Sequence, residues 1–95
     1  MHINEVLWLP DFEEKISDKH RLETDEVEEA LFSEPHVRFV EKGYRPNENL
    51  YAAYGNSDAG RYIIVFFILK PDRRALVISA RDMDEKEKRH YGKRR

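Results

Sequence analysis

The sequence contains no cysteine among its 95 residues, and it has only four glycines, four prolines and one tryptophan. The absence of cysteine excludes a disulfide scaffold and a thiolate metal site, and it is typical of proteins in a reducing compartment. The longest apolar run has eight residues, which excludes a transmembrane helix, and no signal-peptide pattern is present. These absences predict a soluble, cytoplasmic protein with no membrane partner.

Several common catalytic motifs are also missing. The histidines are His2, His20, His36 and His90. No spacing among them is typical of a metal site, and no nucleophile motif of the Gly-x-Ser-x-Gly type occurs. Gly55 and Gly60 have the spacing of a phosphate-binding P-loop, but Arg61–Tyr62 follows where Lys and Ser or Thr are needed. An enzyme with this sequence is expected to work without a thiol, a metal or a cofactor.

Charge is divided unevenly along the chain. Residues 1–48 carry 13 Asp and Glu against 6 Lys and Arg, whereas residues 49–95 carry 6 against 11. The net charge of -2 therefore hides an acidic half and a basic half. A basic half favours contact with an anion, although a solvated helix end explains the basic residues after Lys86 equally well.

The stretch from Arg61 to Arg81 predicts the centre of the fold. Tyr62 to Leu69 is an unbroken apolar run of strand length, so we expect a strand covered on both faces. Pro71 suits the second position of a short turn, and a second strand follows from Ala75 to Ala80. In that strand, alternation places Arg81 on the same side as Val77 and Ser79.

The other elements follow from caps and periodicity. Helices are expected from Asp11 to about Lys19, from Thr24 or Asp25 to about Phe32, and after a capping box at Asp84 and Glu87. Strands are expected at 6–8, 37–41 and 50–54. The prediction is one α+β domain over residues 1–95, with an antiparallel sheet of about four strands, two N-terminal helices and one C-terminal helix.

The polar residues left for chemistry are cationic and aromatic, and this combination suits RNA. Arginine grips phosphate in a bidentate manner, and Tyr or His rings stack on unpaired bases. Cleavage of RNA needs a base for the 2′-hydroxyl, cations for the developing charge and an acid for the 5′-oxygen. We expect these side chains to gather in one concave pocket. The candidate catalytic residues are His20, Arg61, Arg81 and Tyr91, and the candidate RNA contacts are Lys19, Arg74, Lys88 and Arg89.

Each catalytic candidate also has a structural interpretation. Arg81 could pair with the adjacent Asp82, and Arg61 could form a surface ion pair. His20 could cap the first helix, and Tyr91 could be a packing residue with a solvated hydroxyl.

Several short motifs resemble those of BrnT-type toxins, the toxin half of bacterial type II toxin–antitoxin pairs. The motifs span most of the chain in a compatible order, and they are Trp8-x-Pro10, Lys19–His20, Glu28–Phe32, Tyr54–Ser57, Gly60–Arg61, Ile78–Arg81 and Glu87-x-Arg89-x-Tyr91. The resemblance implies a RelE-like ribonuclease fold and RNA cleavage without a metal that arrests translation. It also implies a cognate antitoxin with a ribbon-helix-helix part, through which alone the protein would meet DNA.

The resemblance carries site roles to Lys19, His20, Arg61, Arg81 and Tyr91, with Glu87 and Arg89 in support. Three features depart from the family pattern: Arg21 replaces the glycine usual after Lys–His, Leu50 lies where an arginine is frequent, and two acids, Asp82 and Asp84, closely follow Arg81. These departures favour, as the alternative, a non-catalytic or attenuated module that binds RNA or protein within an antitoxin complex.

Overall fold

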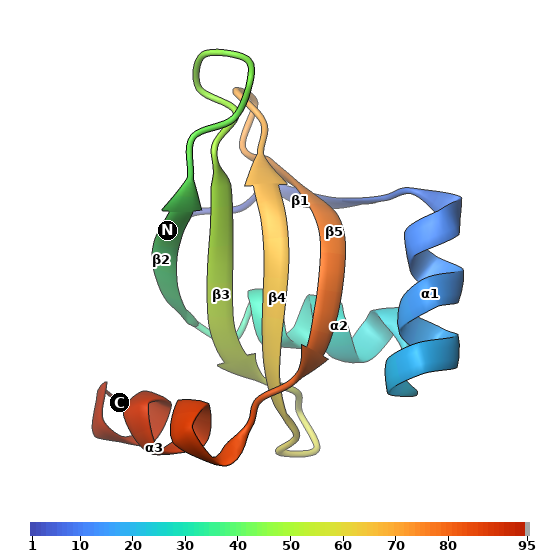
Figure 1. The fold of residues 1–95 in the computed structure, drawn as a ribbon, viewed down its shortest axis with the longest axis vertical. Helices are drawn as coiled ribbons and strands as arrows, with labels where there is room; N and C mark the ends of the chain where they lie inside the picture. Colours follow the sequence, from blue (N-terminus) through green and yellow to red (C-terminus); the bar gives the residue numbers. More distant parts are fainter. Residues whose placement is uncertain (95) are drawn as a thin grey trace.

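Five strands form one sheet in the order β1-β5-β4-β3-β2 (Figure 1). The structure is a computed structural model that describes residues 1–94, apart from the side chains of residues 18–20 and 94. The strands are β1 (Glu5–Trp8), β2 (His36–Glu41), β3 (Leu50–Asn56), β4 (Tyr62–Leu69) and β5 (Arg74–Asp82).

The central hairpin is the one that the sequence predicts. β4 covers the whole apolar run, and β4 and β5 pair in an antiparallel manner. The N–H of Arg73 donates to the carbonyl of Lys70 at 2.9 Å, which places Pro71 at the second position of the turn. Arg73 takes a positive φ of 68°, so the chain returns through one left-handed residue before β5 begins.

The expected all-antiparallel sheet of about four strands is wrong in one respect. β1 adds a fifth strand, parallel to β5, with Val6 opposite Ala75 and Trp8 opposite Val77. The sheet is therefore mixed. Parallel pairing is possible here because a long connection, which contains most of the chain, joins β1 to β5. The apolar segment at 6–8 was recognised in the sequence as an edge strand, but hydrophobicity does not specify which strand it pairs with.

Three helices complete the fold, namely α1 (Pro10–His20), α2 (Thr24–Leu31) and α3 (Glu85–Arg94). α1 begins one residue earlier than expected, because Pro10 rather than Asp11 provides the first helical residue. α2 is capped at Glu23, not at Thr24 or Asp25. No helix of the described chain is both long and apolar enough to cross a membrane.

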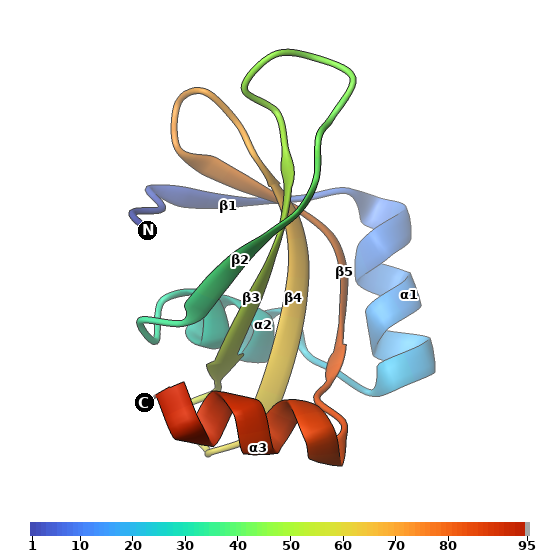
Figure 2. The ribbon, with the colours of Figure 1, turned by 60° about the vertical axis from the view of Figure 1, so that its left-hand side comes forward.

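The two faces of the sheet are covered unequally (Figures 1 and 2). α1 and α2 pack on one face, here called the helix-covered face, over a core that includes Ile63, Val65 and Phe67. The other face, here called the open face, is covered by α3 at one end of the sheet only, where Tyr91 packs on Ile64. One end of the open face thus lies beneath α3, while the other end has no helix over it.

An irregularity in β5 determines which residues lie on each face. Phe67 pairs with Val77 and Phe66 pairs with Ser79, so Ile78 is an extra residue in a β-bulge. The bulge reverses the alternation. Val77 is therefore buried on the helix-covered face, while Ser79 and Arg81 lie on the open face. The expectation that Val77, Ser79 and Arg81 share one side is wrong for Val77.

Candidate active site

A cleft of about 770 Å³ lies between α3 and the adjacent ends of β2 and β3, on the open face. We call it the α3 cleft. Its lining residues are His36, Arg38, Tyr54, Asp84, Lys86, Glu87, His90 and Tyr91. Histidines, cations, carboxylates and aromatic rings thus meet in one concave site.

The register of the strands and the period of the helix bring these side chains together. His36 opens β2 opposite Tyr54 of β3, and the two rings lie 6.1 Å apart at an interplanar angle of 38°. Arg38 is two residues further along β2, so it projects from the same face. On α3, Lys86 and His90 are four residues apart and therefore share one side of the helix.

The two carboxylates of the cleft are engaged by protein groups. Glu87 accepts two hydrogen bonds from Arg81, at 2.8 and 2.9 Å, and a third from the backbone N–H of Asp84 at 2.8 Å. Asp84 accepts from the N–H of Glu87 at 2.8 Å, which completes the capping box predicted for this helix. The hydrogen bonds from Arg81 lower the pKa of Glu87, and the same contact raises the pKa of Arg81. The negative charge of Glu87 is therefore balanced by Arg81.

The cations of the cleft lack such partners. Among the described side chains, no carboxylate lies within ion-pair distance of Arg38 or Lys86. Both are exposed. Glu87 is balanced by Arg81, and the single charge of Asp84 offsets only one of these two cations, so the cleft keeps a net positive charge that can attract an anion.

Tyr91 forms part of the cleft floor and is almost fully buried. Its side chain is 4% exposed, and its hydroxyl donates to Oδ1 of Asn56 at 2.9 Å. Its ring meets that of Tyr62 edge to face, with centroids 5.9 Å apart. These contacts fit a residue that anchors α3 to the sheet.

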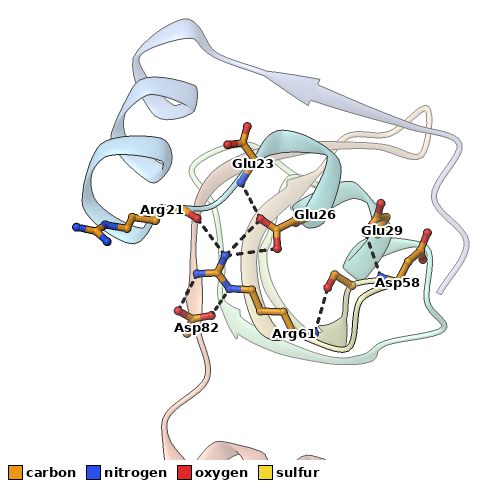
Figure 3. Close-up of polar contacts among 8 residues, drawn as sticks. Arg21, Glu23, Glu26, Glu29, Asp58, Arg61 and Asp82 are labelled. Carbon is orange, nitrogen blue, oxygen red and sulfur yellow. Dashed lines mark hydrogen bonds and ion pairs between the residues drawn. The ribbon is translucent and has the colours of Figure 1, made fainter.

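Arg61 lies in a different polar cluster (Figure 3). Its Nε and Nη2 donate to the two carboxylate oxygens of Asp82, at 2.6 and 3.0 Å. Its Nη1 donates to the backbone carbonyl of Arg21 at 3.0 Å and approaches Glu26 at 3.3 Å. The bond to Asp82 raises the pKa of Arg61. Arg61 thereby ties the turn between α1 and α2 to the end of β5.

The single pocket expected from the sequence does not form. Asp82 pairs with Ile63 and Arg81 pairs with Ile64, so the two neighbours project from opposite faces of the sheet. Arg61, bound to Asp82, belongs to the helix-covered face, whereas Arg81 belongs to the open face. The suggested pairing of Arg81 with the carboxylate of Asp82 is also wrong. Arg81 donates to the backbone carbonyl of Asp82, and its guanidinium binds the carboxylate of Glu87 in a bidentate manner.

The other predicted residues are dispersed. Lys19 and His20 end α1, next to Arg21, and their side chains lie outside the described part of the chain. Arg74 pairs with Asp72 at 2.6 Å, at the opposite end of β5 from α3. The two candidates on α3 are Lys88, which reaches Glu85 at 3.4 Å, and Arg89, which is exposed.

Of the eight lining residues, only Tyr91 and the supporting Glu87 were given site roles from the sequence. His36, Arg38 and Tyr54 of the sheet and Lys86 and His90 of α3 were not. The alternation of β2 does contain a signal, because a histidine and an arginine two residues apart must share a face. What the sequence lacked was the position of α3, which makes that face a cleft.

No group of three or more His, Cys, Asp or Glu among the described residues could hold a metal ion.

Comparison with known proteins agrees with the resemblance noted in the sequence. A family model described as the ribonuclease toxin BrnT of type II toxin–antitoxin systems matches residues 8–87. The chain is similar in fold to the ribonuclease toxin BrnT of Brucella abortus, with a TM-score of 0.61 and 22% identity. That match covers 85% of this chain and 97% of the other. No curated protein matches. The chain belongs to the BrnT family of ribonuclease toxins of type II toxin–antitoxin systems.

Proposed function

We propose that this protein is a toxin that cleaves RNA in the α3 cleft and thereby inhibits translation in the cytoplasm. The observation that carries the proposal is the composition of the cleft. Arg38 and Lys86, which have no carboxylate partner among the described side chains, lie with His36 and His90 around aromatic rings, while Glu87 and Asp84 accept hydrogen bonds from protein groups. Membership of the ribonuclease toxin family supports the same substrate.

The chemistry required can be assigned to this set. The 2′-oxygen of a ribose attacks the adjacent phosphorus as its proton passes to a base, and the bond to the 5′-oxygen breaks as an acid protonates it. His36 and His90 are proposed for the two proton transfers, because histidine can serve either role near neutral pH. Arg38 and Lys86 are proposed to stabilise the phosphorane charge. The cleavage needs no metal and leaves a 2′,3′-cyclic phosphate and a 5′-hydroxyl.

Two of the four catalytic candidates retain a place in this proposal. Arg81 borders the cleft through Glu87, and Tyr91 forms its floor. Arg61 is proposed to act as a structural residue on the helix-covered face. His20 is proposed to lie outside the active site as well, because it precedes Arg21, whose carbonyl accepts a hydrogen bond from Arg61. Lys88 and Arg89, on the same helix as Lys86, are retained as secondary RNA contacts.

The decisive experiment measures cleavage of a labelled single-stranded RNA in EDTA by three variants. His36→Gln and His90→Gln should each slow cleavage about 100-fold or more, since each removes one proton-transfer group. His2→Gln is the matched control, because His2 is an exposed histidine that bonds Asn4 and does not line the α3 cleft. Cleavage that requires added metal, or that survives both cleft substitutions, would contradict the proposal.

A second candidate function is favoured by one observation. Both arginines carried over from the family are paired with carboxylates, Arg61 with Asp82 and Arg81 with Glu87. An attenuated toxin that binds RNA without cutting it fits this neutralisation. Such a protein would show salt-dependent RNA binding with no product, and binding would weaken on mutation of Arg38 or Lys86.

The family also supplies a partner, because a type II toxin is inhibited by an antitoxin protein. We propose that this antitoxin carries a ribbon-helix-helix part that binds DNA, so that the toxin reaches DNA only through it. Co-purification of the two proteins and a DNA-binding assay with and without the antitoxin test this assignment.

A further inference from the structure

The open face continues beyond the α3 cleft into a second concave region, of about 520 Å³. Its floor contains Leu50, Ile68 and Ile78, and its wall is the loop from Lys42 to Glu48 that joins β2 to β3. We call it the apolar groove. Its floor residues Leu50 and Ile68 lie where β3 begins and β4 ends. This is the end of the sheet opposite α3 (Figure 1).

The floor of the apolar groove is a sheet surface without a covering layer. The apolar cluster beneath α3 includes Ala52 and Ile64 from the neighbouring positions of β3 and β4. Leu50 and Ile68 continue the same rows but belong to neither buried cluster, and both remain partly exposed. An apolar sheet face is normally covered by a second layer. Here that layer stops with α3.

The rim of the groove carries one net positive charge, since three cations face two carboxylates. Lys42 and Arg45 lie within ion-pair distance of no carboxylate among the described side chains, whereas Lys70 is neutralised by Glu48 at 2.6 Å. Glu41 offsets one of the two free charges. Tyr44, on the same loop, is fully exposed, so it provides an aromatic side chain at the rim that a partner could cover.

We propose that the apolar groove is the docking surface for an antitoxin segment that has an apolar stripe with acidic flanks. The proposal rests on the toxin assignment and adds the site at which the toxin is held. The cationic rim selects an acidic partner, and the aliphatic floor selects apolar side chains. RNA fits this floor less well, since Leu50, Ile68 and Ile78 offer neither stacking rings nor hydrogen-bond donors.

This position also accounts for inhibition. The groove and the α3 cleft lie on one face of the sheet, and β3 runs from Leu50 in the groove to Tyr54 in the cleft. A segment seated in the groove would restrict the path of an RNA strand along this face toward Arg38. The antitoxin could then block the toxin without contacting His36 or His90.

The test uses this toxin chain and its cognate antitoxin. Lys42→Glu/Arg45→Glu should lower the association rate about tenfold at low ionic strength and much less at high salt. The matched control is Lys15→Glu/Arg21→Glu, which makes the same charge change on exposed side chains of α1 and its C-cap. Tyr44→Ala should shorten the lifetime of the complex, and because Tyr44 is fully exposed the variant should fold normally.

Three outcomes would overturn the docking site. The first is equal loss of antitoxin binding in the rim variant and the control. The second is loss of RNA affinity in the rim variant with antitoxin binding unchanged, which would assign the groove to RNA. The third is a toxin dimer that only the rim variant disrupts, which would assign it to a second copy. RNA cleavage by the free variants is measured separately, so failure of the nuclease assignment is distinguished from failure of the docking site.

Discussion

Arg61 and Asp82 form a bidentate ion pair at the end of the sheet nearest α3, with Nε–Oδ1 at 2.6 Å and Nη2–Oδ2 at 3.0 Å (Figure 3). The remaining nitrogen of the Arg61 guanidinium, Nη1, donates to the carbonyl of Arg21 and to the carboxylate of Glu26. One guanidinium therefore connects β4, β5, α2 and the turn after α1. These contacts indicate that Arg61 stabilises the fold rather than binding substrate.

The first prediction concerns this pair. Arg61→Ala should lower the free energy of unfolding by about 1–2 kcal/mol, because Glu26 and Asp82 lose their common cation while both remain partly hydrated. Cleavage per folded molecule should change little, since Arg61 lies on the face opposite the α3 cleft. Urea denaturation and an RNA cleavage assay on the same sample measure both quantities. If Arg61→Ala loses cleavage while its free energy of unfolding is unchanged, Arg61 must take part in catalysis or RNA binding.

The second prediction is a pH dependence that arises at Glu87. Arg81 lowers the pKa of this carboxyl in the folded protein, so folding favours its ionised form. The stabilisation is complete above the pKa of the unfolded chain, near 4.3–4.5, and is lost as the pH falls through the lower folded value. The melting temperature of the wild type should therefore approach that of Glu87→Gln as the pH is lowered below about 4.

Arg81→Lys is a useful comparison for this experiment. Lysine keeps the charge but cannot donate the two parallel hydrogen bonds seen at 2.8 and 2.9 Å. The pH dependence should be weakened rather than abolished. A difference between wild type and Glu87→Gln that persists unchanged at low pH would show that the pair is not its source.

The separation of Arg61 from Arg81 shows what sequence patterns could and could not specify. The β4–β5 hairpin was predicted because an eight-residue apolar run and a proline turn are local signals. Strict alternation then placed Arg81 with Val77, which would have put it on the same face as Arg61. The bulge at Ile78 shifts the alternation by one residue, so Arg81 lies on the face opposite Val77. A bulge is fixed by pairing with β4, so periodicity within β5 alone does not reveal it.

The same limit applies to the candidate site. The capping box at Asp84 and Glu87 was predicted and is confirmed, because its spacing is contained within one turn of helix. The α3 cleft was not predicted. It requires the start of β2, the end of β3 and the terminal helix to meet, and these segments are far apart in the sequence. His36 and Arg38 gain their proposed role only from that tertiary arrangement.

The third prediction separates chemistry from packing at Tyr91. Tyr91→Phe keeps the ring contact with Tyr62 and removes the hydrogen bond to Asn56. The expected result is a loss of about 0.5–1.5 kcal/mol in stability, with cleavage close to that of the wild type. Thermal melting and single-turnover cleavage test the two halves independently. A large fall in cleavage without a change in melting temperature would make the hydroxyl a catalytic group.

The final prediction tests how closely α2 packs on β3. A Cβ on Gly55 would overlap the carbonyl oxygen of Ala30 and lie 2.8 Å from Oγ of Ser33. Ser33 is itself held at the end of α2 by a 2.7 Å bond to Ala30, so it cannot yield without disturbing the helix end. Gly55→Ala should destabilise the protein by about 1–3 kcal/mol, because the backbones of β3 and α2 would have to move apart.

Gly92→Ala provides the matched control for this substitution. A Cβ there meets nothing within 4 Å, and Gly92 lies inside α3. The same change of residue should therefore stabilise the protein by about 0.5–1 kcal/mol through helix propensity. Opposite signs for the two variants in urea denaturation are expected. If Gly55→Ala leaves the free energy of unfolding unchanged, the end of α2 does not pack against β3 as closely as the contacts with Ala30 and Ser33 indicate.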